Sequence, residues 1–256
     1  MNRKVVFLCG RSESSKQIYN GLKHKINFDA VIIENPPSKK QLFERRIKKL
    51  GYSKTFGQLL FILTVPRLLN LFSRKKKKKI CKQLNLNSNP IDSKNIHEVK
   101  SANSEESLTL LKKIRPDLII VNGTRILSKK TLSGTSAEFI NTHVGITPKY
   151  RGVHGGYWAL VNDDIKNFGV TIHKVNQGID TGDIIYQKTI IPSNEDNFVT
   201  YPLVQTAAGI ELILKTLKDF NSDNLKIRKN KILESKLWHH PTLWEYLYFR
   251  ILRKVK

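Results

Sequence analysis

Residues Lys4–Ile18, KVVFLCGRSESSKQI, carry the pattern on which the fold of this chain depends. The run Lys4–Cys9 is short and apolar and ends at a glycine, which is typical of a strand buried on both faces of a sheet. The small residues Gly10–Ser15 predict a loop, and Ile18 and Leu22 have the spacing of an apolar helix face. Strand, small-residue loop and helix together indicate the start of a βα unit.

The same alternation continues along the chain. Strands are predicted at Phe28–Ile33, Ile96–Val99, Asp117–Val121, Phe139–Ile140, Gly169–Val175 and Ile184–Ile191, and helices at Ser104–Lys113 and Val204–Phe220. Strands that alternate with helices predict an α/β fold with a doubly wound, mostly parallel sheet, whose ligands bind at the carboxyl ends of the strands. We assign residues 1–200 to this domain and residues 201–256 to a short C-terminal helical extension.

Composition narrows the class of protein. With 256 residues, of which 39% are hydrophobic, the chain can bury a core and is not disordered. Its two cysteines, Cys9 and Cys81, provide neither a disulfide framework nor a zinc spacing, so no metal is expected. The first residues are too poor in apolar side chains for a signal peptide, and we therefore expect a cytoplasmic protein.

The charge of the chain is extreme and uneven. Lys and Arg number 45 against 21 Asp and Glu, a formal net charge of +24. Residues 39–82 hold fifteen of these cations and a single acid, Glu44. Within this basic apolar insertion, the apolar stretch Phe56–Phe72 precedes Arg74–Lys79, RKKKKK. A bilayer span needs about 20 mostly apolar residues, so this stretch is too short and too polar for one.

Three interpretations of the insertion compete. It forms a core or lid helix followed by a solvated basic loop, or an interfacial helix with a polybasic anchor at Phe56–Lys79 on an anionic membrane. Trp238–Lys256 is either a helix docked on the core or a second membrane-surface element. The third interpretation of the insertion, a nucleic-acid footprint, is the weakest, because the basic run Arg74–Lys79 lacks interleaved aromatic residues. No nucleic-acid partner is therefore expected.

Two motifs bring together residues suited to acyl transfer. In Phe139–Gly152, FINTHVGITPKYRG, Asn141 and His143 are two positions apart at a strand end and therefore share one face. In Gly178–Asp183, GIDTGD, Asp180 occupies a tight turn between two strands. An Asn amide can donate to an oxyanion, a His can move an amine proton, and an Asp can orient the His. Each residue alone is common in ordinary turns.

Together with Lys-Tyr-Arg-Gly at 149–152 and Gly-Val-Thr-Ile-His at 169–173, these motifs resemble the folate-dependent formyltransferases. That family includes glycinamide ribonucleotide, methionyl-tRNA and sugar N-formyltransferases. The resemblance covers about Val5–Ile191 and is strongest from Gly123 to Asp183. It implies a Rossmann-like formyltransferase fold, 10-formyltetrahydrofolate as formyl donor and a small-molecule primary amine as acceptor.

The resemblance also implies roles for single residues. Catalysis would fall to Asn141, His143 and Asp180. The pterin slot would be lined by Arg125, Ile126, Leu127, Val175, Asn176, Gln177, Gly178 and Ile179. The acceptor would face Gly10, Arg11 and Ser12, with Arg151 either binding an acceptor phosphate or standing as a solvated turn residue.

The acceptor is the open question. We favour a nucleotide- or lipid-linked amino sugar for surface polysaccharide synthesis. The tRNA branch carries an RNA-binding barrel for which too little chain follows Thr200, and the purine enzyme's pattern lacks the 39–82 insertion. Glycinamide ribonucleotide, methionyl-tRNA, and a non-catalytic membrane-associated binding protein on the same scaffold are the alternatives. A homodimer and a peripheral position on the inner membrane surface are both left open.

Overall fold

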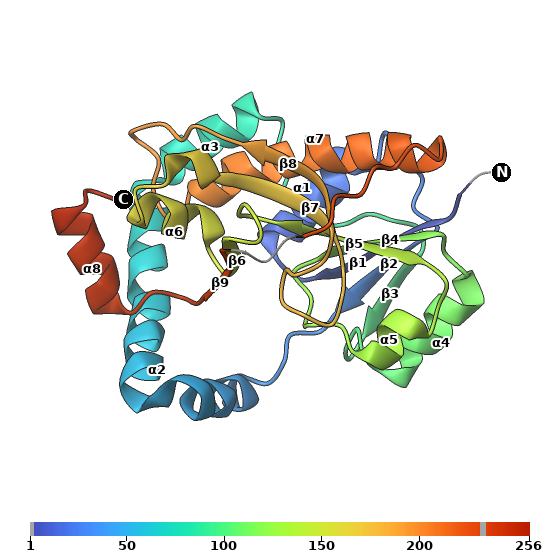
Figure 1. The fold of residues 1–256 in the computed structure, drawn as a ribbon, viewed down its shortest axis with the longest axis horizontal. Coiled ribbons are helices and arrows are strands. Elements are labelled where there is room, and N and C mark those ends of the chain that lie inside the picture. Colours follow the sequence, from blue (N-terminus) through green and yellow to red (C-terminus); the bar gives the residue numbers. More distant parts are fainter. Residues whose placement is uncertain (1–2, 231–233) are drawn as a thin grey trace.

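The computed structural model describes residues 3–230 and 234–256, and a central sheet organises them (Figure 1). Its strand order is β3-β2-β1-β4-β5-β7-β8, and β6 pairs with β9 outside it. The strands are β1 (Val5–Gly10), β2 (Ala30–Glu34), β3 (Ile96–Val99), β4 (Leu118–Asn122), β5 (Glu138–His143), β6 (Tyr150–Gly152), β7 (Gly169–Lys174), β8 (Ile184–Thr189) and β9 (Lys236–Trp238). Strands β3 to β5 of this order are parallel, and β7 and β8 are antiparallel. The predicted mostly parallel α/β fold is confirmed.

Helices cover both faces of the sheet. They are α1 (Glu13–Leu22), α2 (Lys39–Phe72), α3 (Arg74–Gln83), α4 (Glu105–Ile114), α5 (Lys129–Ser133), α6 (Gly155–Val161), α7 (Tyr201–Asn221) and α8 (Leu243–Leu252), with a 3₁₀ turn at Ile165–Asn167. The odd-numbered residues of β1, such as Phe7, pack with α1 and α7. The even-numbered ones, such as Leu8, pack with α4 on the opposite face. Because β1 is buried on both faces, its sequence reads as one apolar run.

Side-chain caps fix where several helices begin. The Ser12 hydroxyl accepts a hydrogen bond from the Ser15 N–H at 3.1 Å, which starts α1 directly after β1. Thr242 and Glu245 form a reciprocal capping box at the start of α8. Such side chains satisfy N–H groups that have no partner inside the helix. Ser104 caps α4 in the same way, so the helix predicted from Ser104 begins where it is observed.

The insertion folds as helices throughout. Helix α2 bends at Gly51, whose φ of 78° and ψ of 171° are open to glycine and strained for other residues. The basic run Arg74–Lys79 lies in α3, so the solvated basic loop of the first interpretation is wrong. Lysine is a good helix former, Ile80 of α3 is buried, and Lys76 pairs with the Asp196 carboxylate at 3.1 Å, which together hold the run helical.

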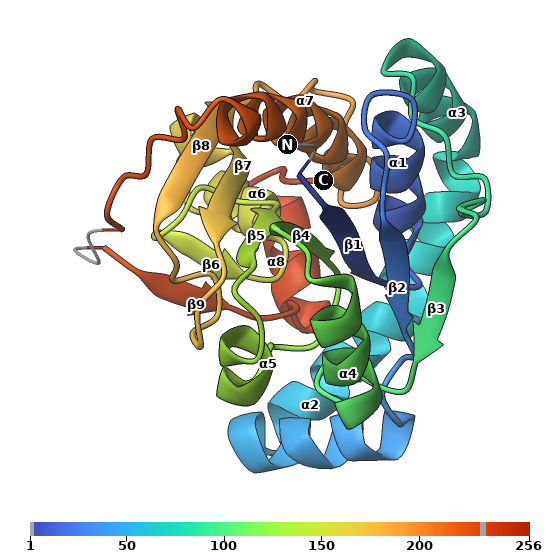
Figure 2. The ribbon, with the colours of Figure 1, turned by 90° about the vertical axis from the view of Figure 1, so that its right-hand side faces the viewer.

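Aromatic contacts join the insertion and the C-terminus to the body. The Phe61 ring in α2 lies 4.9 Å from Phe198 and 5.4 Å from Tyr246 in α8, measured between ring centroids. Helix α7 packs along α1, where Ile210 contacts Gly21 closely. The expected domain boundary at residue 200 stays a prediction, and α7 on its far side forms part of the layer that covers the sheet (Figure 2).

Truncating Phe61 tests whether α2 is docked. Phe61 is 0% exposed, so Phe61→Ala should lower the free energy of unfolding by about 3 kcal/mol, as large-to-small core changes do. The control is Phe56→Ala five residues earlier, where the ring is 58% exposed and the change should stay within about 0.5 kcal/mol. Urea unfolding measures both, and equal effects would mean that α2 does not pack as described.

Candidate active site

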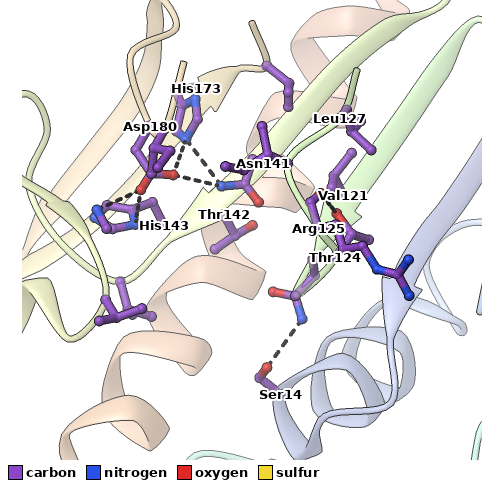
Figure 3. Close-up of a pocket in the computed structure, with 18 of the residues that line it drawn as sticks. Ser14, Val121, Thr124, Arg125, Leu127, Asn141, Thr142, His143, His173 and Asp180 are labelled. Atoms are coloured by element: carbon purple, nitrogen blue, oxygen red, sulfur yellow. Dashed lines mark hydrogen bonds and ion pairs between the residues drawn. The ribbon is translucent and has the colours of Figure 1, made fainter. Parts of the chain in front are cut away.

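A cavity of about 360 Å³ lies at the carboxyl ends of β4 and β5 (Figure 3). Its wall includes Asn141 and His143 at the end of β5, and His173 at the end of the neighbouring antiparallel strand β7. The loop after β7 adds Asp180. The cavity therefore lies where parallel sheets bind ligands, and it contains the three residues assigned to catalysis from sequence.

The Asp180 loop folds back over the sheet because its backbone is unusual. Asp180 has a φ of 51°, in the left-handed region that Asp tolerates better than most residues. Gly182 passes so close to β7 that a Cβ atom there would lie 1.6 Å from the Lys174 carbonyl oxygen. The Asn176 carboxamide oxygen accepts hydrogen bonds from the Gly178 N–H and the Thr181 hydroxyl, which closes the loop.

The Asp180 carboxylate is the centre of the cluster. Its side chain is 13% exposed, and it lies 3.3 Å from His143 Nδ1 and 3.5 Å from His173 Nε2. Burial alone would raise the pKa of this carboxyl, but the two histidines, together with a hydrogen bond from the Gly152 N–H at 2.8 Å, outweigh burial and hold the pKa well below its ordinary value. Asp180 is therefore ionised at neutral pH.

His143 is held at both ring nitrogens. Nε2 lies 2.6 Å from the Tyr150 carbonyl oxygen, which can only accept, so we assign the Nε2–H tautomer. Nδ1 lies 3.3 Å from Asp180 Oδ2, so both ring nitrogens of His143 face hydrogen-bond acceptors. A proton taken up at Nδ1 would be stabilised by this carboxylate.

Asn141 and His173 complete the cluster. The Asn141 Nδ2 group lies 3.2 Å from His173 Nε2 and 3.4 Å from Asp180 Oδ1, distances at which hydrogen bonds orient the amide but hold it weakly. His173 Nδ1 donates to the Lys174 carbonyl at 2.7 Å. Sequence reasoning missed His173, although it lies two positions before Val175 and therefore on the same side of β7 as a residue assigned to the pterin slot.

Strand β6 fastens the cluster through three consecutive residues. The Tyr150 carbonyl holds His143, and the Gly152 N–H holds Asp180. Between them, Arg151 donates from Nη1 to the Ile179 carbonyl at 3.0 Å and from Nε to the Ser235 hydroxyl at 2.6 Å. Among the residues described, Arg151 lines neither this cavity nor the adjoining one. Its predicted contact with an acceptor phosphate stays a prediction, and its observed contacts position the Asp180 loop.

The residues assigned to the pterin slot lie mostly on the cavity wall. Seven of the eight line it: Arg125, Ile126, Leu127, Val175, Asn176, Gly178 and Ile179, whereas Gln177 is outside the set. The Arg125 backbone N–H donates to Glu34 Oε1 at 2.8 Å, and its guanidinium donates to the Asn35 carbonyl at 2.7 Å. The Arg125 side chain thus anchors the loop, and the cavity receives the apolar side chains that follow.

The residues assigned to the acceptor lie elsewhere. Gly10 is buried, Ser12 caps α1, and the Arg11 guanidinium reaches toward Asn35 and Glu98, so within the described residues none of the three lines the cavity. Instead, Ser14 and Thr206 line the cavity and also a second one of about 330 Å³ between α1, α2 and α7. The wall of that second cavity is largely apolar and includes Phe61, Ile62 and Pro66 of the insertion, so this part of α2 packs as the core or lid helix of the first interpretation would.

Comparison with known proteins decides the family. The family model for formyl transferase matches residues 3–205 of this chain. The chain belongs to the formyl transferase family. In the described part of the chain, no group of three or more His, Cys, Asp or Glu side chains could hold a metal ion.

Relatives of this formyl transferase chain have different acceptors in their names. Methionyl-tRNA formyltransferase from Kosmotoga olearia is 32% identical over 133 residues, 52% of this chain and 42% of the relative, so the chain spans less than half of that protein's length. Phosphoribosylglycinamide formyltransferase from Anaplasma phagocytophilum is 18% identical with a TM-score of 0.58 and coverage of 93% of this chain and all of that one. An N-formyltransferase from Helicobacter canadensis, solved with folinic acid and dTDP-3-aminofucose, is 18% identical with a TM-score of 0.54 and coverages of 91% and 70%. The two structural likenesses establish the fold alone.

Replacing Asp180 by Asn should change how the free energy of unfolding depends on pH. At pH 7 we expect the free energy of unfolding to fall by about 3 kcal/mol, as when a buried ion pair loses one partner. The folded-state pKa of Asp180 lies below the unfolded value of about 3.9, so its stabilisation is present above that value and is lost as the pH falls through the folded pKa. The difference between wild type and Asp180→Asn should therefore narrow by about 1 kcal/mol at pH 3. Urea unfolding at the two pH values measures it, and a constant difference would contradict the assignment.

Proposed function

We propose that this chain transfers a formyl group from 10-formyltetrahydrofolate to the primary amine of an amino sugar carried on a nucleotide or a lipid. The observation that carries the proposal is the convergence of Asn141, His143 and Asp180 on one cavity at the carboxyl edge of the sheet. An amide donor, an imidazole and a buried carboxylate meet the needs of acyl transfer to an amine.

The Asn141 amide has the chemistry to stabilise an oxyanion. When the amine nitrogen attacks the formyl carbon, negative charge develops on the formyl oxygen. The amine nitrogen then loses a proton, the bond between the formyl carbon and the donor nitrogen breaks, and that nitrogen gains a proton as tetrahydrofolate leaves. The two N–H bonds of the Asn141 Nδ2 group face His173 Nε2 at 3.2 Å and Asp180 Oδ1 at 3.4 Å, so one of these contacts must be exchanged for the formyl oxygen. Because both contacts are long, the exchange costs little, and the remaining contact keeps the amide oriented.

His143 has the chemistry to take the proton that the attacking amine loses. Its Nε2 faces the Tyr150 carbonyl and its Nδ1 faces the Asp180 carboxylate, so the ring has to turn from one of these partners to reach the attacking amine. The imidazolium formed would be stabilised by the ionised Asp180 at 3.3 Å. The low pKa of Asp180 favours a role in stabilising charge over a role in storing protons.

The cavity wall suits a pterin. Leu127 and Val175 offer apolar surface for a flat ring, and Thr124 and Asn176 on the same wall carry polar side chains. The bound donor would supply the activated formyl group. The chain's own part is to orient that group against Asn141 and to exclude water from it.

The second cavity suits the remainder of the acceptor. It shares Ser14 and Thr206 with the first, so an acceptor whose amine lies near Asn141 can extend beneath α2. Its aromatic and aliphatic wall favours contact with a sugar ring or an apolar carrier group. The Helicobacter canadensis structure, with its folinic acid and dTDP-3-aminofucose, supports a folate donor and an amino-sugar acceptor for this fold. The similarity to methionyl-tRNA formyltransferases makes a tRNA acceptor the second candidate.

Formyl transfer to a panel of amines tests the proposal. Wild-type protein should form tetrahydrofolate and a formylated amino sugar, and Asn141→Ala and His143→Ala should each lower kcat about 10²–10³-fold, as expected when one transition-state contact is lost. Mass spectrometry of the acceptor measures the product. His97→Ala on the outer strand β3 is the matched control and should leave kcat unchanged.

The panel also separates the rival acceptors. It contains nucleotide-linked amino sugars, glycinamide ribonucleotide and initiator methionyl-tRNA. Turnover with the ribonucleotide or the tRNA alone would replace the amino sugar and keep the chemistry. If the folded protein transfers no formyl group from the donor to any of these amines, the proposal is wrong.

Arg151→Met separates positioning from acceptor binding. If Arg151 acts through the Ile179 carbonyl, the variant should lower kcat about 10–100-fold by loosening the Asp180 loop, with KM for the acceptor unchanged. A raised acceptor KM with normal kcat would instead favour the phosphate contact predicted from sequence. Steady-state kinetics at saturating donor distinguishes the two.

A further inference from the structure

Helix α8 exposes the side of its surface that a helix normally buries. Its large apolar residues follow the spacing i, i+3, i+4, i+7 and i+8, which in a soluble protein faces the core. These residues are Trp244, Leu247, Tyr248, Ile251 and Leu252, between 46% and 70% exposed. Within this helix only Tyr246 is fully buried. Much of the apolar side of α8 is therefore exposed, although Trp244 also contacts α2 at Gly57.

Helix α2 shows the same inversion after its bend. Phe56, Leu63 and Leu71 lie near one side of the helix and are 58%, 41% and 69% exposed. The polar Gln58 points the other way, is 4% exposed, and donates its Nε2 hydrogen to the His240 carbonyl at 2.7 Å. A buried amide together with exposed leucines is unusual for a helix surface that faces water, and indicates that this side of α2 contacts an apolar partner.

The two apolar sides form one surface. Trp244 of α8 packs against α2 at Gly57, where a Cβ atom would lie 2.1 Å from the indole ring. The two helices lie side by side at the edge of the molecule farthest from α4 and α5 (Figure 1). We define the α2–α8 surface as Phe56, Leu63, Leu71, Trp244, Leu247, Tyr248, Ile251 and Leu252. Contiguous apolar surface of this kind marks an interaction site.

Unpaired cations border this surface. Helix α3 begins two residues after Phe72 and exposes Arg74, Lys75, Lys78, Lys79 and Lys82. None of these five lies within ion-pair distance of a carboxylate in the part of the chain that the structure describes. By contrast, Lys76 and Lys77 on the inner side of α3 are tied to Asp196 and Glu13. The free charge therefore lies on the outside of the molecule.

We propose that the α2–α8 surface and the exposed cations of α3 dock this protein onto an anionic lipid bilayer. Apolar side chains, two interfacial aromatic residues and unpaired lysines are the combination that binds such an interface. A second copy of the chain would bring two strongly positive surfaces together, since residues 39–82 hold fifteen cations and one acid. Charge complementarity thus selects the anionic bilayer over a symmetric dimer.

The docking is peripheral. By length and composition alone, the helix Lys39–Phe72 could cross a membrane. Of its most apolar 18-residue stretch, 28% is buried in the protein. Its inner side, however, holds Phe61 among Phe198 and Tyr246, and a span would pull that ring out of the core. The outer side alone is free for lipid. The same helix lines the second cavity with Phe61, so docking places that cavity one helix away from the bilayer.

Sedimentation of the full chain with vesicles tests the proposal without any activity measurement. Vesicles of phosphatidylcholine mixed with phosphatidylglycerol should bind the protein, and vesicles of phosphatidylcholine alone should bind it far less. Replacing Arg74, Lys75, Lys78, Lys79 and Lys82 by Gln should weaken binding to the anionic vesicles about 100-fold or more. The matched control replaces five exposed lysines of the opposite side by Gln: Lys94, Lys100, Lys112, Lys113 and Lys129.

A second variant tests the apolar part. Leu247→Ser with Ile251→Ser changes exposed positions and should leave the unfolding midpoint unchanged while reducing vesicle binding at least tenfold. Replacing the α3 lysines by Arg should retain binding. No binding of wild-type protein to anionic vesicles, or an equal loss in the opposite-side control, would overturn the proposal. Dimerisation in analytical ultracentrifugation that Leu247→Ser with Ile251→Ser abolishes, without vesicle binding, would assign the surface to a second copy.

Discussion

One buried carboxylate organises the candidate site of this chain. Asp180 is surrounded by groups that favour its charge: His143, His173 and the Gly152 N–H. A buried charge without such partners would cost several kcal/mol, so the surrounding segments must arrive in register for the fold to tolerate it. Strand β6 meets this demand by holding both the ring and the carboxylate. The same arrangement orients Asn141, and thus stability and chemistry rest on the same contacts.

The insertion links this site to the outer surface. Helix α2 turns its inner side to an aromatic cluster and to the second cavity, and its outer side to solvent. The bend at Gly51 sets the direction of the docked half, and Trp244 over Gly57 joins it to α8. Because the helix is held by Phe61 on one side only, its other side is available without disturbing the core. Acceptor binding and surface attachment would therefore involve the same helix.

Much of the sheet and part of the site could be predicted from local pattern. Val5–Gly10 and Leu118–Asn122 are buried on both faces, and their unbroken apolar runs predict such strands directly. Asn141 and His143 were found because two residues apart on a strand share one face. His173 was missed because it lies opposite Asn141 only when β7 pairs antiparallel with β5, a pairing that the local sequence does not indicate. The solvated loop expected at Arg74–Lys79 is a helix because Ile80 and Asp196 hold it, a contact distant in sequence.

By itself the sequence determined the strands of the central sheet, its mostly parallel arrangement and the identity of the polar residues at its carboxyl edge, because these depend on periodicity and on residues close together along the chain. The tertiary structure decided which groups meet. It directed Arg11 toward Glu98 and Arg151 toward Ile179, and it brought Ser14 and Thr206 together between two cavities. It also left the apolar sides of α2 and α8 outside. Each of these outcomes depends on contacts between residues far apart in sequence, which no local pattern encodes.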